Sequence, residues 1–273
     1  MRNYKIIACD LDGTLLNNAG QVSPENLAAI GALQEKGIYF VPCSGRTFAE
    51  IPASIRENEN IRYIIHSNGA TVLDKQTGHR METGISNALM QEILQVLTAC
   101  QMHLTIRHGG KCYVDARYQT RKDFDYYNVI VPHQDCVNNY ATHSHNFMEM
   151  AFEFDNAEVV SAFFHDYDEK MACKKKLEAT GKLRVVEASE YNIEIMNIEA
   201  GKGNALYALC DLLGVDYEDT ISMGDSDNDS SVTKAAGLGL AMANAVDSLK
   251  AIADEIICSN EEHGVEYVLN HYF

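Results

Sequence analysis

Residues 4–14 have the sequence Tyr-Lys-Ile-Ile-Ala-Cys-Asp-Leu-Asp-Gly-Thr, which joins a short apolar segment to two aspartates and a glycine. Apolar, partly β-branched runs that end in a polar turn are typical of buried strands. Because the apolar residues do not alternate with polar ones, we expect a strand covered on both faces, as in a parallel sheet. The stretch predicts an α/β fold with Asp10 and Asp12 at the carboxyl end of its first strand.

The neighbouring segments continue this pattern toward residue 70. Ser23-Pro24 supplies an N-cap with proline at the first helical position, and Gly37 is placed to end the helix. Strands are predicted at 38–43 and 63–66, so the region predicts right-handed βαβ units. Catalytic loops in such sheets lie at the carboxyl ends of the strands.

The middle of the chain has a different pattern, and the alternation resumes after residue 193. For the middle we predict a helix at 86–100, strand-like segments at 104–106, 112–114, 150–154 and 183–186, and an irregular loop at 131–146. The last third predicts a helix at 205–213 and strands at 220–223, 238–242 and 255–258. The sequence thus predicts a discontinuous core of residues 1–83 and 192–273, interrupted by an inserted domain of residues 84–191.

Composition bounds the class of protein. The chain has 273 residues, 46% of them apolar, which is enough for a substantial buried core and argues against disorder. Its 22 basic and 39 acidic residues give a net charge of −17, which argues against nucleic acid or an anionic membrane as a partner. We find neither an apolar stretch of about 20 residues nor a signal-peptide pattern, so we expect a cytoplasmic protein; its oligomeric state is unknown.

The eight cysteines are scattered without a Cys-x-x-Cys pair. This spacing fits reduced thiols better than a disulfide framework or a zinc site. His133, Cys136, His143 and His145 also lack a regular zinc-ligand spacing, so a polar loop is the simpler interpretation.

Two acidic clusters follow predicted strands. Gly13 allows a bend that lets Asp10 and Asp12 face one site, as a nucleophilic carboxylate beside a general acid/base helped by a divalent metal; the alternative is an ordinary Asp-Gly turn. The second cluster is residues 224–229, Gly-Asp-Ser-Asp-Asn-Asp, whose hard oxygen ligands suit Mg²⁺ or simply cap the next helix.

A calcium loop at the second cluster is excluded by two positions. Ser230 stands where an EF-hand requires glycine, and Ala236 stands where it requires a bidentate glutamate. Because Mg²⁺ takes few carboxylates, Asp227 is expected to be solvated rather than a ligand.

Candidate phosphate donors lie between the acidic clusters. Residues 44–46 are Ser-Gly-Arg after the second strand, and residues 201–203 are Gly-Lys-Gly at a helix start. A hydroxyl, backbone N–H groups and an ammonium group are the donors that a phosphoryl group needs. A Walker loop is excluded, because Gly203 stands where Ser or Thr is required and no glycine precedes Gly201 by five residues.

The joint order of these motifs resembles the haloacid dehalogenase (HAD) superfamily of phosphohydrolases. The segments that are similar to its Cof-type, class IIB branch are residues 10–15, 44–46, 68–70, 202–203 and 242–245. The resemblance covers the chain from Tyr4 to about Asn270. It implies a Rossmann-like parallel-sheet core with an inserted α+β type 2 cap domain. Residues 230–233 depart from the family pattern, which often has a Met-Leu pair there.

The resemblance also implies the roles of the site residues. Asp10 would be the nucleophile that accepts the phosphoryl group, and Asp12 would protonate the leaving oxygen and then activate water. The remaining implied roles are phosphate binding by Ser44, Gly45, Lys202 and Asn228, Mg²⁺ binding by Asp10, Asp225 and the Asp12 carbonyl, and support from Asp229 and Arg46.

These roles imply a Mg²⁺-dependent phosphatase that acts on small phosphorylated metabolites, such as sugar phosphates or phosphorylated cofactors, through an aspartyl-phosphate. The alternatives are a phosphotransferase or mutase with the same intermediate, and a non-catalytic ligand-binding regulator. A dianionic phosphate repels Asp10 unless Mg²⁺ and Lys202 neutralise the site, so the metal fits the chemistry. The physiological substrate is not evident. Aromatic and basic residues of the insertion (Tyr113, Arg117, Tyr118, Arg121, Tyr126, Tyr127) form either a specificity surface or part of a packed cap.

Overall fold

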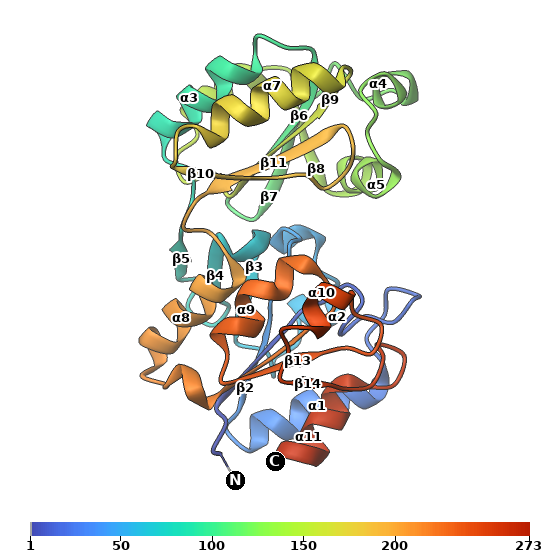
Figure 1. Cartoon of the computed structure of the whole chain (residues 1–273), viewed down its shortest axis with the longest axis vertical. Helices are drawn as coiled ribbons and strands as arrows, with labels where there is room; N and C mark the ends of the chain where they lie inside the picture. Colours follow the sequence, from blue (N-terminus) through green and yellow to red (C-terminus); the bar gives the residue numbers. More distant parts are fainter. Residues whose placement is uncertain (1) are drawn as a thin grey trace. The chain divides into compact units, whose positions relative to one another are not determined.

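The computed structural model describes residues 2–273 and contains two compact units (Figure 1). The core comprises the chain up to Arg46, Ile51–Met81 and Gly201–Phe273; the cap comprises Thr47–Glu50 and Glu82–Ala200. This division differs from the predicted boundaries after residues 83 and 191. Strand β11 (Asn192–Asn197) belongs to the cap because it pairs antiparallel with two cap strands, β9 (Val159–Phe164) and β10 (Leu183–Val186).

The core is built on a five-stranded parallel sheet in the order β14-β13-β12-β1-β2. Its strands are β1 (Ile6–Cys9), β2 (Tyr39–Pro42), β12 (Thr220–Gly224), β13 (Leu238–Ala241) and β14 (Glu255–Ile256). In the register, Ile6 lies opposite Thr220 on one side and Tyr39 on the other. The carboxyl ends of β1, β2 and β12 therefore meet at one edge, as the sequence predicted for a parallel α/β sheet.

Helices complete the core. Its longer helices are α1 (Pro24–Glu35), α8 (Lys202–Leu213), α9 (Ser230–Ala235) and α11 (Gly264–Tyr272), and its shorter ones are α2 (Ala53–Arg56), α10 (Asp247–Lys250), η3 (Tyr217–Asp219) and η4 (Asp227–Asp229). The Ser23 side chain caps α1 by accepting from the Asn26 N–H, as expected from the Ser-Pro pair. Apolar residues of α8 and α9 share a buried cluster with Ile6, Ala8 and Val41, while α1 packs against α11.

The predicted third strand lies parallel to the chain after β2 and gains a second, antiparallel partner. Strand β3 (Tyr63–His66) joins the parallel sheet only through a bridge between Cys43 and Ile65, and it pairs antiparallel with β4 (Thr71–Asp74). The order of this small sheet is β3-β4-β5, where β5 is Arg80–Glu82. The turn η2 (Ser67–Gly69) between β3 and β4 is too short for a helical crossover, so the strands form a hairpin.

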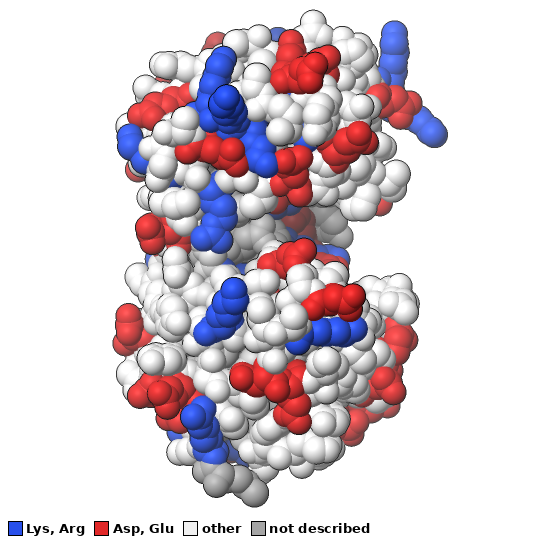
Figure 2. Space-filling view, in the orientation of Figure 1, with Lys and Arg blue, Asp and Glu red and all other residues white. Residues whose placement is uncertain are grey.

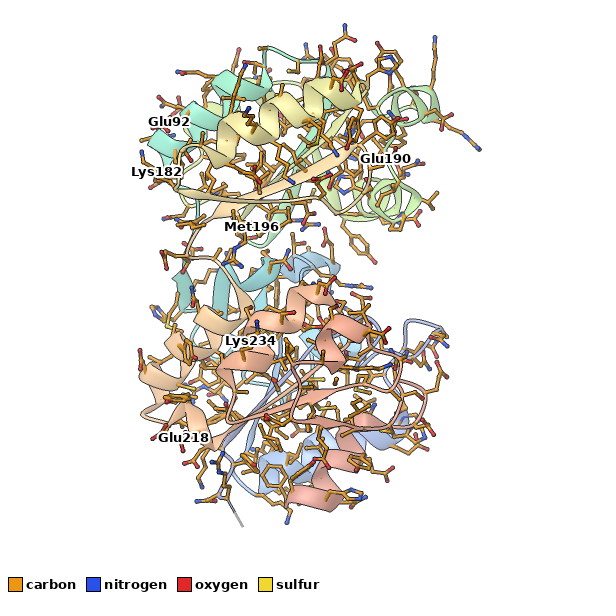
Figure 3. All side chains as sticks on the ribbon, viewed as in Figure 1. Glu92, Lys182, Glu190, Met196, Glu218 and Lys234 are labelled. Carbon is orange, nitrogen blue, oxygen red and sulfur yellow. The ribbon has the colours of Figure 1, made fainter. Side chains whose placement is uncertain are left out.

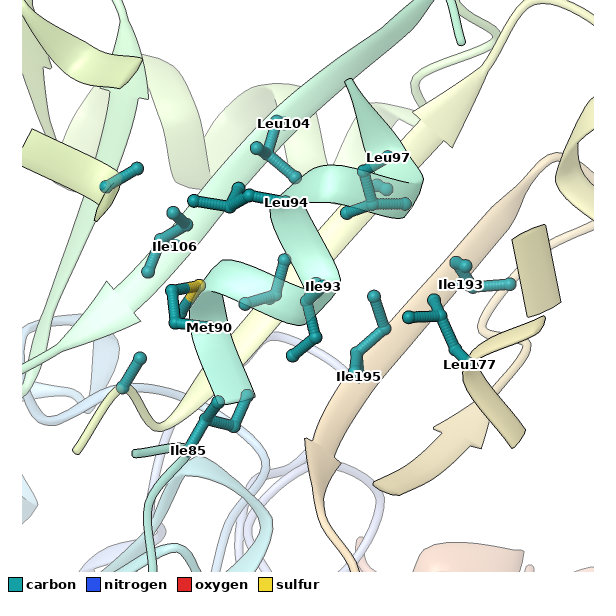
Figure 4. Packing of buried hydrophobic residues seen from close by; sticks show 14 of the residues in the cluster. Ile85, Met90, Ile93, Leu94, Leu97, Leu104, Ile106, Leu177, Ile193 and Ile195 are labelled. Atoms are coloured by element: carbon teal, nitrogen blue, oxygen red, sulfur yellow. The ribbon is translucent and has the colours of Figure 1, made fainter. Parts of the chain in front are cut away.

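The cap is a six-stranded sheet in the order β10-β11-β9-β6-β7-β8, with β7 and β8 parallel and the other neighbours antiparallel. Its further elements are η1 (Phe48–Glu50), α3 (Asn87–Leu97), β6 (Met102–His108), β7 (Lys111–Asp115), α4 (Arg121–Tyr126), α5 (Val131–Tyr140), β8 (Ala141–Ser144), α6 (Phe147–Glu153) and α7 (Tyr167–Glu178). Figure 4 shows Met90 and Ile93 of α3 packed beside Ile106 and Ile195 of the sheet.

Two predictions for the cap were wrong. Most of residues 131–146 form helix α5 (131–140) and strand β8 (141–144) rather than an irregular loop. In α5 only His133 and Val137 are buried, so the apolar face that would mark a helix is very narrow. Residues 150–154 belong largely to helix α6, whose buried residues Phe147 and Ala151 have helical spacing.

The surface carries both signs of charge. On the face shown in Figure 2, acidic and basic side chains are interspersed on each unit. In the cap, Lys182 forms an ion pair of 3.7 Å with Glu92 of α3, and Figure 3 shows the two side chains as neighbours. Within residues 2–273, no helix combines the length and apolarity needed to cross a bilayer.

Candidate active site

Lys202 and Asp10 form a buried ion pair at the carboxyl edge of the core sheet. Asp10 follows the last residue of β1, and Lys202 is the first residue of α8. The Lys202 ammonium lies 2.6 Å from Asp10 Oδ1, and the two side chains are 1% and 7% exposed. A buried charge pair is stable only when its remaining donors and acceptors are also hydrogen-bonded. The groups that bond to this pair therefore outline the site.

Asp229 is the second partner of the same ammonium. Its Oδ1 lies 2.6 Å from Lys202 Nζ, and its Oδ2 accepts from the backbone N–H groups of Asp225 and Ser226 at 3.0 and 3.1 Å. Both oxygens are therefore used in holding Lys202 and the turn after β12. Asp229 therefore contacts Lys202, the residue that it is predicted to support.

Asp225 completes a group of three carboxylates. One oxygen from each of Asp10, Asp225 and Asp229 lies within 4.8 Å of the others. Asp225 Oδ1 is buried and lacks a hydrogen-bond partner among the described residues. An orphaned, buried carboxylate oxygen beside a second carboxylate fits a hard divalent cation such as Mg²⁺.

Gly13 makes this approach possible. Its φ is +78°, and a Cβ at this position would overlap the Asp225 carboxylate. The predicted bend after Asp10 and Asp12 therefore serves a second purpose, because it brings the loop against Asp225. A residue with a side chain at position 13 would force the two segments apart.

The electrostatics of the site follow from burial. Burial raises the pKa of Asp10 to about 7, against the opposing effect of the Lys202 charge. Burial, followed by the charge of Asp229, raises the pKa of Asp225 to about 6. Burial alone would lower the pKa of Lys202, but Asp10 and Asp229 hold it above its ordinary value. The surroundings of Asp10 and Asp225 thus hold too little positive charge to stabilise both ionised carboxylates, and a dication would supply it.

The predicted Ser-Gly-Arg segment lies beside η2. Ser44 is 1% exposed, and its Oγ accepts from the Arg46 N–H at 3.1 Å. The Asn68 N–H donates to the Ser44 carbonyl at 3.0 Å, and a Cβ at Gly45 would come within 2.8 Å of Asn68 Oδ1. The contacts with Asn68 therefore fix this loop. Ser44 Oγ acts as an acceptor toward Arg46, so its hydroxyl hydrogen can be donated to a ligand.

Comparison with known proteins decides the family. Residues 7–269 match the haloacid dehalogenase-like hydrolases. The chain belongs to this family. It is 31% identical to phosphatase YwpJ of Bacillus subtilis, covering 98% of this chain and 99% of that protein. It is 30% identical to the 5-amino-6-(5-phospho-D-ribitylamino)uracil phosphatase YwtE of the same organism, covering 97% of each chain.

Solved HAD structures share the whole fold. A HAD-like hydrolase from B. subtilis is 30% identical with a TM-score of 0.79, covering 98% of this chain and 100% of that chain. The HAD subclass IIB sugar phosphatase BT4131 is 18% identical with a TM-score of 0.78, covering 98% of each chain. The chain is thus a HAD-like hydrolase with an inserted cap, similar in sequence to phosphatases, and it shares the fold of the subclass IIB phosphatase BT4131. HAD enzymes generally depend on Mg²⁺, which agrees with the carboxylate triad.

Three other residues of the predicted HAD site, Asn228, Asp227 and Asp12, are exposed. Asn228 is exposed, and its Oδ1 accepts from Ser226 Oγ at 2.8 Å, whereas the support of Lys202 comes from Asp229. Asp227 is also exposed and accepts from Ser248 Oγ. Asp12 is bound by Arg46, whose Nε and Nη2 reach its two carboxylate oxygens.

Two HAD segments matched by sequence have structural roles that the sequence did not reveal. Gly69 has a φ of +87°, and a Cβ there would overlap the backbone of Gly201 and Lys202. The Asn244 side chain donates to the Gly13 carbonyl at 2.8 Å and accepts from the Asn260 N–H at 2.9 Å. Both segments therefore hold the loops that carry Lys202 and Asp12.

Some of the aromatic and basic cap residues line a cavity of about 530 Å³. Arg117, Tyr118, Tyr126 and Tyr127 contribute to its wall together with His103. Tyr113 instead packs against Phe154, and the Arg121 side chain is 92% exposed. Part of the predicted set thus shares one concave surface, and part does not.

Proposed function

We propose that the protein is a Mg²⁺-dependent phosphomonoesterase that acts through a phosphorylated Asp10. The observation that carries this proposal is the buried Lys202 ammonium, 2.6 Å from both Asp10 and Asp229, beside the orphaned oxygen of Asp225. The positive charge of Lys202 lies at Asp10, and Asp10 adjoins Asp225, which we assign to the metal. Such an arrangement supports attack of Asp10 on an electrophile that is itself anionic.

The reaction would proceed in two balanced steps. In the first, Asp10 Oδ attacks phosphorus, the bond from phosphorus to the leaving oxygen breaks, and Asp12 gives that oxygen a proton. In the second, Asp12 takes a proton from water, whose oxygen attacks phosphorus and releases phosphate and free Asp10.

Other groups would hold the phosphoryl oxygens. We assign this role to the Ser44 hydroxyl, the Gly45 N–H and the Lys202 ammonium. Mg²⁺, held by Asp10, Asp225 and the Asp12 carbonyl, would supply positive charge that offsets the charge of the transferring group. Asp229 would keep Lys202 in place through the reaction.

The substrate we propose is the phosphate ester of a small polyhydroxylated metabolite, a sugar phosphate or a phosphorylated cofactor precursor, in the cytoplasm. The relative YwtE carries the name of a ribitylaminouracil phosphate phosphatase, so that compound belongs in the test panel. Its two parts, a polyol phosphate and a heterocycle, can be tested separately with sugar phosphates and nucleotides.

The test is phosphate release from a panel of phosphate esters with and without Mg²⁺. We expect hydrolysis that requires Mg²⁺ and is lost in Asp10→Asn, with a phosphorylated wild-type protein trapped by acid quench. If wild type and Asp10→Asn are equally inert over the panel, the proposal fails. Transfer to an added alcohol in preference to water would instead identify a phosphotransferase.

A further inference from the structure

A second group of metal-ligating side chains lies within the cap. Glu50, Cys112 and Cys136 each offer one ligand atom, and these atoms lie within 4.8 Å of one another. The three residues come from η1, β7 and α5. None belongs to the carboxylate triad of the core, and the proposed hydrolysis uses none of them.

The Glu50 carboxylate is oriented toward the thiols. Cys136 Sγ lies 2.7 Å from Glu50 Oε1, while Oε2 accepts from the Thr47 N–H at 2.8 Å. Arg107 Nη2 lies 3.9 Å from the same Oε2. One oxygen therefore faces the two sulfur atoms while the other is held by a backbone donor and a cation, as in metal sites whose ligands are fixed by a further layer of hydrogen bonds.

The local charge allows a dication to bind. Arg107 lies between two acidic side chains, Glu50 and Glu194, at 3.9 and 3.8 Å. With both thiols protonated, these groups carry one net negative charge. A dication that displaces one proton from each thiol leaves that net charge unchanged, so the cap buries no additional charge.

We propose that Glu50, Cys112 and Cys136 bind one Zn²⁺ ion. Two thiolates and a carboxylate select a thiophilic metal over Mg²⁺ or Ca²⁺, which prefer oxygen ligands. Three protein ligands leave a fourth tetrahedral position for water. Glu50 and Cys112 are 6% and 1% exposed, and Cys136 is partly exposed, which gives the ion a route from solvent.

The site fastens a segment that continues directly from the predicted phosphate loop. Residues 44–46 belong to the core, whereas Thr47–Glu50 belongs to the cap, where the Ala49 N–H also donates to the Gly110 carbonyl at 3.2 Å. Zn²⁺ would bond this segment to a strand and a helix of the cap. It would thus fix within the cap the segment that directly follows Arg46, independently of catalysis.

The experiment is a Co²⁺ titration of the full chain, first stripped with chelator and kept reduced with a phosphine. We expect one equivalent of Co²⁺ to produce a thiolate-to-cobalt charge-transfer band, and Zn²⁺ to abolish it because Zn²⁺ binds more tightly. Oxygen ligands give no such band, so Co²⁺ in the carboxylate triad does not contribute. Zn²⁺ should also raise the Tm of the wild type.

Matched variants assign the ligands. Cys112→Ser and Cys136→Ser should lose the band, and Glu50→Gln should weaken Co²⁺ affinity by about tenfold or more. Cys100→Ser is the control, because Cys100 and Cys173 form another close thiol pair, 3.3 Å apart between sulfur atoms. This control and Asp225→Asn should both keep the band.

The proposal is overturned if the wild type shows no thiolate band, or if the band survives in both Cys112→Ser and Cys136→Ser. Loss of the band in Cys100→Ser alone would place the metal at the other thiol pair and would also overturn it. Circular dichroism establishes that each variant is folded. If Cys112→Ser does not fold, Cys136→Ser and Glu50→Gln decide the outcome.

Discussion

Arg46 donates to both carboxylate oxygens of Asp12, with Nε 2.8 Å from Oδ2 and Nη2 2.7 Å from Oδ1. This paired geometry fixes the plane of the carboxylate. Arg46 takes one lone pair of each Asp12 oxygen, so a second lone pair on each oxygen remains to carry the proton that Asp12 delivers to a leaving group. Arg46 is therefore a positioning residue for the proposed general acid.

We predict that Arg46→Ala lowers kcat for an alkyl phosphate by about tenfold, since general acid catalysis contributes about 10²–10⁴ and only its positioning is lost. An aryl phosphate with a good leaving group needs little protonation and should lose much less. Arg46→Lys should restore only part of the loss, because lysine lacks the planar fork. Steady-state kinetics on both substrates measure this, with Arg56→Ala as a control; equal losses on both substrates would contradict the assigned role.

Gly13 is predicted to control metal affinity. Gly13→Ala places a Cβ on the Asp225 carboxylate, so we expect the apparent Mg²⁺ affinity to fall by about tenfold or more, the size of effect seen when a ligand's support is disturbed. Gly20→Ala is a matched control, because Gly20 has a φ of +72° but nothing within 4 Å of its Cβ position. In both variants, alanine in the left-handed backbone conformation should lower the free energy of unfolding by about 1–2 kcal/mol.

Activity measured over a range of Mg²⁺ concentrations separates these effects. Gly13→Ala should need more Mg²⁺ for half-maximal activity, whereas Gly20→Ala should need the same amount as wild type. If the two variants behave alike, the overlap with Asp225 has no effect on the metal.

The carboxyl edge of the parallel sheet was predictable from sequence because its residues follow strands directly. Asp10 and Asp225 each come after a buried apolar run, and parallel strands end at a common edge. The start of α8 was marked in the same way by Gly201 and Lys202. The local sequence pattern was therefore sufficient to predict that these side chains lie close together.

The contacts behind the site were not predictable, because they join segments distant in sequence. The fit of Gly69 against Lys202 depends on a left-handed turn and on the backbone of a distant segment. Helix α5 was missed because only His133 and Val137 face the interior. The grouping of Glu50 with Cys112 and Cys136 arises from three elements, so no spacing in the sequence marks it.

Lys202 is predicted to be required for both the stability and the activity of the protein. Lys202→Met leaves Asp10 and Asp229 buried without their shared cation, so we expect a loss of about 3–5 kcal/mol in unfolding free energy and no measurable turnover. The double variant Lys202→Met with Asp229→Asn removes one of the two unpaired charges. It should regain part of the stability but none of the activity, as measured by urea unfolding and phosphate release. Equal stability of the single and double variants would contradict this account.

Asp74 and Arg62 give a pH-dependent contribution to the stability of the core. Arg62 Nη2 lies 2.9 Å from Asp74 Oδ2, and Arg62 Nε lies 3.2 Å from Oδ1. The hydrogen bonds from Arg62 lower the pKa of Asp74 to about 2. A folded-state pKa below the unfolded value stabilises the fold above the unfolded pKa, and this contribution is lost as the pH falls through the folded pKa.

The unfolded pKa of an aspartate is about 3.9, so the contribution should be complete above about pH 4 and nearly absent below about pH 2. A double-mutant cycle with Asp74→Asn, Arg62→Gln and both together isolates it from other carboxyl groups. We expect the coupling free energy from urea unfolding to be positive at pH 6 and to shrink as the pH approaches 2. Because Arg62 is 35% exposed, added salt should weaken it. A coupling that stays constant across this pH range would show that the ionised carboxylate is not its source.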